Sequence, residues 1–140
     1  MNQFRFHTPI VVSYSDIDAQ WHVNNKAFLS YIETARFQYL QEVGLFSGDS
    51  FLEVPFIVAD VHVKYLAPIE YKDAVVVSMG VTHIGNKSVI MEYAITSPDG
   101  SRVYATAETV LVTFDYHTKT SIPVNAEIRR RISEYEGCAF

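Results

Sequence analysis

One segment of this chain carries the spacing of a long helix, and β-type segments lie on both sides of it. Between residues 25 and 43 apolar side chains recur at three- and four-residue steps, which is the period of an amphipathic helix; they are Phe28, Tyr31, Ile32, Ala35, Tyr39, Leu40 and Val43. Asn24 or Asn25 can cap its start, because a short side-chain carbonyl accepts a free first-turn amide, and Gly44 can end it. The apolar stripe is predicted to face the core.

The remaining segments indicate strands. Residues 4–14 predict a first strand, and four more are predicted at 56–66, 74–83, 88–96 and 103–116, with turn sequences at 85–86 and 97–100. Residues 56–66 alternate polar with apolar, which is typical of a half-buried strand, whereas 74–83 predict a more fully buried one. Residues 128–135 predict a short closing helix. This order favours an α+β fold, an antiparallel sheet packed around one long central helix.

Composition limits the class of protein. With 140 residues, of which 49% are hydrophobic and 19% charged, the chain is expected to form a single domain over residues 1–140. A net charge of −5 argues against nucleic-acid binding, which needs a basic face. No run approaches the roughly 18 apolar residues of a membrane span, so no membrane partner is expected. One cysteine, Cys138, excludes an internal disulfide and favours a reducing, cytoplasmic location.

Two groups of charged residues are interpreted as surface features. Glu33 and Arg36 lie three residues apart on the predicted long helix, a spacing that favours a modest surface ion pair. Residues 129–131 are all arginine and have glutamates nearby, so they are interpreted as the solvated face of the C-terminal helix.

A short polar crossing between two apolar runs is the candidate functional site. Residues 14–25 contain the carboxylates of Asp16 and Asp18, the imidazole of His22 and the amides of Asn24 and Asn25. Polar groups crowded beside a core-forming segment are costly unless they are hydrogen-bonded or used. Asp18 could be the side chain of an Asx-turn before the helix, or it could be catalytic. Asp16 suits a structural hydrogen-bonding role, because two close carboxylates raise one another's pKa.

A resemblance to a known family covers almost the whole chain. The motif Asp16-x-Asp18-x-x-Trp21-His22-Val23-Asn24-Asn25, followed by Tyr31-x-Glu33-x-Ala35-Arg36, resembles the hotdog-fold acyl-CoA thioesterases of the 4-hydroxybenzoyl-CoA thioesterase type. Residues 56–61, the sequence Tyr65-Leu66-x-Pro68 with Asp73, the hairpin Gly85-x-Lys87-Ser88 and Pro123 also match. The hotdog fold implied by the resemblance agrees with the element order predicted from the pattern.

The resemblance implies a chemistry for the polar crossing. The carboxylate at the position of Asp18 attacks the thioester carbonyl or deprotonates water, and a backbone amide near Asn25 polarises the carbonyl. A helix start suits this second role, since its first amides are unpaired and lie at the positive end of the dipole. No cofactor and no metal is expected, because the scattered histidines lack the spacing of metal ligands.

Other site residues are predicted with alternatives. His22 is interpreted as positioning or lining the substrate, or as an essential base, and Gln20 as positioning water or substrate. Trp21 departs from the family pattern and would narrow the acyl pocket or only pack the loop. Phe28 and Phe56 are predicted to line an acyl channel. By resemblance, Lys87 and Ser88 contact the CoA nucleotide and phosphates; an ordinary turn lysine is the alternative for Lys87.

Three functional hypotheses follow. The first is an acyl-CoA thioesterase; the second is a thioesterase for acyl-carrier protein, for which few basic residues are available to bind an acidic partner. The third is a non-catalytic acyl-CoA-binding module on the same fold. A hotdog dehydratase is disfavoured, because its histidine-centred helix motif is absent. A lone sheet leaves an open edge, so a homodimer or homotetramer is expected.

Overall fold

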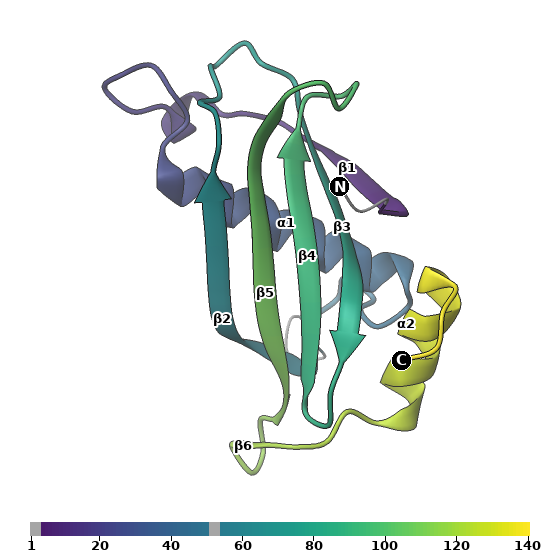
Figure 1. Ribbon diagram of the computed structural model, residues 1–140. Coiled ribbons are helices and arrows are strands. Elements are labelled where there is room, and N and C mark those ends of the chain that lie inside the picture. The colour runs from purple at the N-terminus through teal and green to yellow at the C-terminus, as the bar shows by residue number, and fades with distance from the viewer. Residues whose placement is uncertain (1–3, 51–53) are drawn as a thin grey trace.

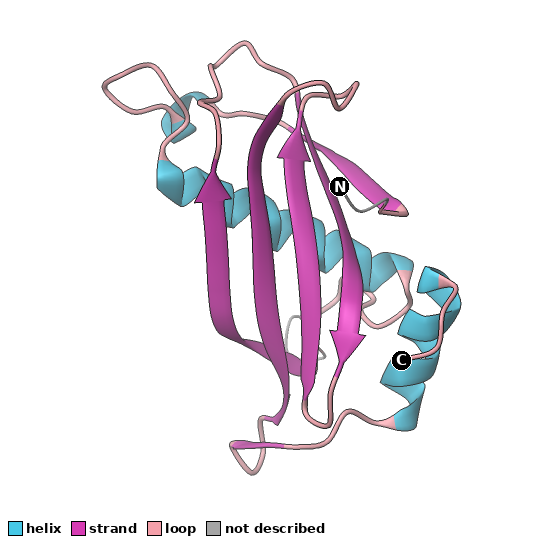
Figure 2. Cartoon of the chain, in the orientation of Figure 1, coloured by secondary structure: helices cyan, strands magenta, loops and turns pink. Residues whose placement is uncertain are grey.

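The computed structural model describes residues 4–50 and 54–140, and its elements follow the predicted order. They are β1 (Phe6–Ile10), the 3₁₀ helix η1 (Tyr14–Asp16), α1 (Asn25–Glu42), β2 (Phe56–Tyr65), β3 (Val75–Ile84), β4 (Ser88–Thr96), β5 (Val103–Asp115), β6 (Thr120–Ser121) and α2 (Ala126–Glu136). The antiparallel sheet has the strand order β1-β3-β4-β5-β2, with β6 paired to β5 (Figure 1). Figure 2 shows α1 crossing one face of this sheet and α2 beside the β3 edge.

The long helix forms where the apolar period predicts it. The stripe residues Phe28, Tyr31, Ile32, Ala35, Tyr39, Leu40 and Val43 are all buried and belong to the main core cluster. Asn24 is the N-cap, with its side-chain oxygen accepting from the Ala27 amide at 3.2 Å. At the other end Gly44 has a φ of 84°, which a residue with a side chain rarely adopts. The predicted core face is confirmed.

The middle strands supply the opposite wall of the core. In β3, β4 and β5 every second side chain faces α1 and is buried, as in Val77, Met79, Met91, Ile95 and Leu111. The fully buried character predicted for β3 is confirmed. Among the described residues no helix is long and apolar enough to cross a membrane.

The prediction of a half-buried β2 is wrong for the chain alone. β2 is an edge strand, and a bulge between Val58 and Asp60 shifts its register. Val58, Val61 and Tyr65 pair with buried residues of β5 and share their face, yet they expose 42%, 43% and 44% of their surface. The alternation predicted the faces correctly, but α1 leaves much of this edge uncovered. An apolar edge strand is therefore available for association.

Both ends of the chain also differ from the prediction. β1 covers only Phe6–Ile10 of the predicted 4–14, because its partner β3 begins at Val75, opposite Ile10. η1 and the two-residue β6 were not predicted. α2 is longer than the predicted 128–135, since Asn125 caps it by accepting from the Ile128 amide at 2.8 Å.

Two charged side chains are not surface features. The predicted ion pair is present, with Nη2 of Arg36 4.0 Å from Oε2 of Glu33, but Arg36 itself is only 8% exposed. Burial raises the pKa of the Tyr93 phenol, and the nearby Arg36 guanidinium opposes that shift. Arg129 also departs from the predicted solvated face, because it donates to the Gly85 carbonyl at 3.0 Å. Arg130 and Arg131, in contrast, pair with Glu127 at the surface as predicted.

Candidate functional site

Asp18 begins a tight turn in the crossing between β1 and α1. The Asp18 amide donates to the His22 carbonyl at 2.9 Å, and the Trp21 amide donates to the Asp18 carbonyl at 3.0 Å. Oδ1 of Asp18 accepts from the amides of Gln20, at 2.9 Å, and His22, at 3.4 Å. This is the Asx-turn geometry. Its other oxygen, Oδ2, has no hydrogen-bond partner among the described residues, so one carboxylate oxygen holds the turn while the second is free.

Trp21 occupies the strained position of this turn. Its φ is 64°, in the left-handed region that a bulky side chain rarely adopts, and the residue is 67% exposed. Strain of this kind persists where surrounding contacts determine the backbone. The hydrogen bonds that fix Asp18 are those contacts. The turn that positions the carboxylate therefore requires the unfavourable φ of Trp21.

Asp16 has the structural role predicted for it. Its Oδ2 accepts from the Ser13 amide and from the Tyr31 hydroxyl, both at 2.9 Å. Its backbone carbonyl accepts from the Asn24 amide at 2.8 Å. Burial and the neighbouring Asp16 carboxylate raise the pKa of the Tyr31 phenol. Asp16 therefore joins η1 to the start of α1, and it is Asp18 that is left with a free oxygen.

The start of α1 presents unpaired amides beside this turn. Asn25 and Lys26 precede the first intrahelical hydrogen bond, and their amides have no partner among the described residues. Together they form the positive end of the helix dipole. The carbonyl of Asn25 accepts from the Tyr65 hydroxyl at 3.3 Å, which ties the helix start to the end of β2. Such a helix start can hold a developing negative charge without a cationic side chain.

One cleft brings most of the predicted polar residues together. It has a volume of about 320 Å³ and is lined by Asp18, Gln20, His22, Val23, Asn25, Phe28, Tyr65, Leu66, Ala67 and Pro68. This is the lower end of the range for small-molecule sites. The rings of Phe28 and Tyr65 meet edge to face at 5.1 Å and form its apolar wall. The imidazole of His22 has no hydrogen-bond partner in the described part of the chain.

Five lining residues, Val23 and those at positions 65–68, were not predicted as site residues. The chain leaves β2 here, and the Val23 amide donates to the Ile69 carbonyl at 2.8 Å, which brings this segment against the turn. The Tyr65-Leu66-x-Pro68 match to the family was the available signal. Trp21 lies next to the cleft in sequence but does not line it.

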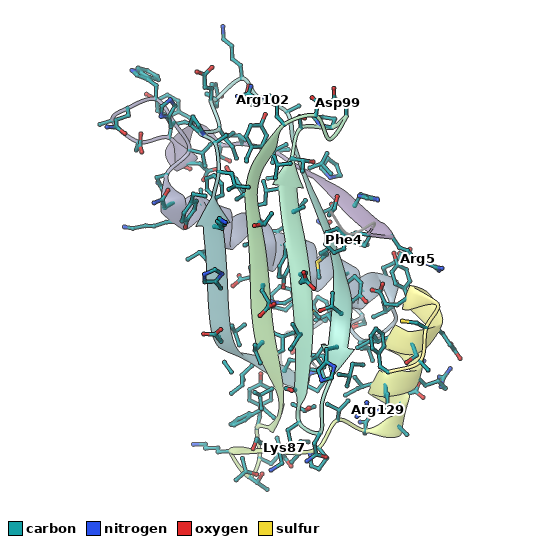
Figure 3. The ribbon with its side chains drawn as sticks, in the orientation of Figure 1. Phe4, Arg5, Lys87, Asp99, Arg102 and Arg129 are labelled. Atoms are coloured by element: carbon teal, nitrogen blue, oxygen red, sulfur yellow. The ribbon has the colours of Figure 1, made fainter. Side chains whose placement is uncertain are left out.

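Phe56, Lys87 and Ser88 lie at the other end of the sheet. Tyr65 in the cleft pairs with Ala105, whereas Phe56 pairs with Thr113, whose amide donates to the Lys87 carbonyl at 2.9 Å. The eight steps from residue 105 to residue 113 span roughly 26 Å in an extended strand. Figure 3 shows Lys87 at the end of the sheet opposite Arg102 and Asp99. Within one chain, the residues predicted to bind phosphate therefore lie far from Asp18.

The family follows from comparison with known proteins. A sequence model described as the thioesterase-like superfamily matches residues 12–132. The chain belongs to this superfamily. Membership makes it a thioester hydrolase by class, and the predicted hotdog fold is confirmed by superfamily members of known structure.

Individual members of the superfamily agree with the assignment. A thioesterase from Thermus thermophilus, solved in complex with coenzyme A and Zn, is 34% identical with a TM-score of 0.88, and each chain is covered completely. The long-chain acyl-CoA thioesterase FadM of Escherichia coli is 25% identical over 127 residues, which are 91% of this chain and 96% of FadM. A predicted thioesterase from Bacillus stearothermophilus is 26% identical, with a TM-score of 0.83 and coverage of 92% and 94%.

Proposed function

We propose that this chain hydrolyses acyl-CoA thioesters to a free acid and CoA. The observation that carries the proposal is the cleft in which the free carboxylate oxygen of Asp18 and the unpaired amide of Asn25 are combined. Thioester hydrolysis needs a nucleophile or base on one side of the carbonyl and a donor for the oxygen that becomes negative. The named relatives, one an acyl-CoA thioesterase and one complexed with coenzyme A, support CoA as the carrier.

In the proposed reaction Oδ2 of Asp18 attacks the carbonyl carbon, or takes a proton from a water that attacks it. The carbonyl electron pair moves to oxygen, where the Asn25 amide stabilises it, and collapse of this intermediate breaks the carbon–sulfur bond and releases the CoA thiolate. In the first route water then hydrolyses the anhydride with Asp18. The turn restricts the position of the carboxylate, which lowers the entropy lost when it meets the carbonyl. Gln20 and His22 position substrate or water.

We further propose that the working site needs a second copy of the chain. β2 is an edge strand with exposed apolar side chains, and antiparallel pairing of two β2 edges reverses the ends of one sheet relative to the other. Lys87 and Ser88 of one copy then approach the Asp18 cleft of the other, with Phe56 on the same side. The separation of roughly 26 Å within one chain supports this arrangement. A homodimer is the minimum assembly, and a homotetramer is compatible with it; each copy is taken as one domain over residues 1–140, in the cytoplasm.

The test separates the structural and catalytic roles of Asp18. Asp18→Asn keeps a side-chain oxygen that can accept from the Gln20 and His22 amides but lacks the carboxylate, whereas Asp18→Ala loses both. Wild type and variants are assayed for thiol release from aliphatic and aromatic acyl-CoAs, with Asp49→Asn as an exposed carboxylate control.

We expect Asp18→Asn to retain the wild-type Tm and to lose about 10²–10⁴-fold in kcat, as when a general base is removed. Asp49→Asn should behave as wild type. An Asp18→Asn variant with wild-type turnover would leave Asp18 only its turn role. A wild type that releases no thiol from any acyl-CoA would overturn the proposal and direct the assay to carrier-protein thioesters.

A further inference from the structure

The turn between β3 and β4 is held from two sides through its carbonyl groups. The Lys87 carbonyl accepts from the amide of Thr113 at 2.9 Å and from its hydroxyl at 3.2 Å. The Asn86 carbonyl accepts from the Val124 amide at 2.8 Å, just before α2 begins. The Gly85 amide donates to the Ser88 carbonyl at 2.8 Å and closes the turn. The end of β5 and the segment before α2 therefore both fix this turn.

A third contact comes from the side of α2. Nη2 of Arg129 donates to the Gly85 carbonyl at 3.0 Å, so each carbonyl from Gly85 to Lys87 has a donor. The amides of Asn86 and Lys87, in contrast, have no partner among the described residues, and the Lys87 side chain is exposed. Figure 3 shows Lys87 and Arg129 at the same end of the sheet. The turn thus has its acceptors satisfied while its donors and its ammonium group stay available to an anion.

Arg129 differs from its neighbours on α2 in what it contacts. Arg130 pairs with Glu127 at 2.8 Å and with Glu134 at 2.9 Å, and its side chain is 51% exposed. Arg131 also binds Glu127. Of these consecutive arginines only Arg129 reaches the turn that carries Lys87, and the Glu127 carboxylate contacts the other two.

We propose that Arg129 is a positioning residue for the nucleotide end of the acyl-CoA: it holds the Gly85 carbonyl and so fixes the turn that presents Lys87 to the phosphates. This inference rests on the proposed function. It assigns α2, which is distant from the cleft of its own chain, a role in affinity for the coenzyme and none in the chemical step.

The experiment compares Arg129→Ala with Arg130→Ala, a matched loss of one guanidinium from the same helix. Each is assayed with an acyl-CoA and with the corresponding acyl-pantetheine thioester, which lacks the nucleotide. Binding of free CoA is measured by calorimetry, so that the result does not depend on turnover. Arg129→Lys, which keeps a donor for the Gly85 carbonyl, serves as the conservative variant.

For Arg129→Ala we expect a KM for acyl-CoA and a Kd for CoA raised about three- to tenfold, the effect of one hydrogen bond. The kcat and the kinetics with acyl-pantetheine should stay unchanged, Arg130→Ala should match wild type, and Arg129→Lys should recover most of the affinity. Unchanged CoA affinity in Arg129→Ala would overturn the inference, as would an equal loss with both thioesters or no CoA binding by wild type. A wild type that binds CoA but hydrolyses neither thioester would overturn the proposed function alone, because the binding comparison still decides the role of Arg129.

Discussion

The helix start offers a way to delete a single backbone donor without deleting the helix. Asn25 is the first residue of α1, and its amide has no hydrogen-bond partner among the described residues. Proline is favoured at this position because it lacks only an amide that the helix does not use. The preceding Asn24 has a φ of −74° and a ψ of 158°, which is the extended conformation that a residue before proline adopts. Asn25→Pro should therefore fold.

The magnitude follows from what the variant keeps and loses. The cap from Asn24 to the Ala27 amide and the bond from Tyr65 to the carbonyl of residue 25 both remain possible. The donor proposed for the developing oxyanion is lost, and removal of one such donor costs about 2.7–4 kcal/mol of barrier, or roughly 10²–10³-fold in kcat. Asn25→Ala keeps the amide and should retain the wild-type kcat.

Steady-state thiol release and thermal melting of the two variants decide the matter. We expect Asn25→Pro to melt close to wild type, with the loss confined to kcat. A folded Asn25→Pro variant with wild-type kcat would refute the assignment of this amide as the donor. A large fall in Tm would refute the argument that the backbone at this position already suits proline.

Three further predictions concern assembly, the helix cap and alkaline stability. Random mixing of Asp18→Asn with Lys87→Ala subunits should restore about a quarter of wild-type sites, since half of the dimers are mixed and each mixed dimer has one intact site. Activity is measured at substrate concentrations below KM. If the mixture is no more active than the mean of the two unmixed variants, both residues of a site lie in one chain. Asn24→Ala should lower the free energy of unfolding by about 1 kcal/mol through loss of the cap; an unchanged urea midpoint would contradict this. Burial and the Glu136 carboxylate raise the pKa of the Tyr39 phenol. Above pH about 10 the unfolded chain therefore loses a proton that the folded state keeps, and the free energy of unfolding falls as pH rises. Urea titrations across this range should show a smaller fall for Tyr39→Phe, and an equal fall would exclude Tyr39 as the cause.

The sequence predicted the elements well because their signals are local. The apolar period of α1, its asparagine cap and its terminal glycine all lie within the segment that they define, and the structure confirms them. β2 shows where such reasoning ends. Its alternation predicts which side chains share a face, but the covering of that face depends on strand order, which no local pattern contains.

Charged residues show the same limit at the scale of single side chains. Spacing correctly places Glu33 within reach of Arg36, but it does not predict that Arg36 is buried and lies near Tyr93 of β4, more than fifty residues away. Asp18 is more instructive. The structure confirms the Asx-turn through one oxygen, while the catalytic role proposed for the other oxygen stays a prediction. A pattern of residue types does not reveal that the two oxygens of one carboxylate differ in their hydrogen bonding.

The two edges of the sheet are unequal, and this limits how far copies of the chain can associate. β1 is five residues long and contains Pro9, while Glu136 of α2 accepts from the Val81 amide on β3 at 3.1 Å, just beyond the end of β1. A short strand interrupted by proline makes a poor template for pairing. β2 is ten residues long and exposes the apolar side chains of Val58, Val61 and Tyr65. In the proposed dimer, pairing of β2 with β2 would use the same patch on both copies and close on itself, so the sheet would grow to two chains without continuing into a filament.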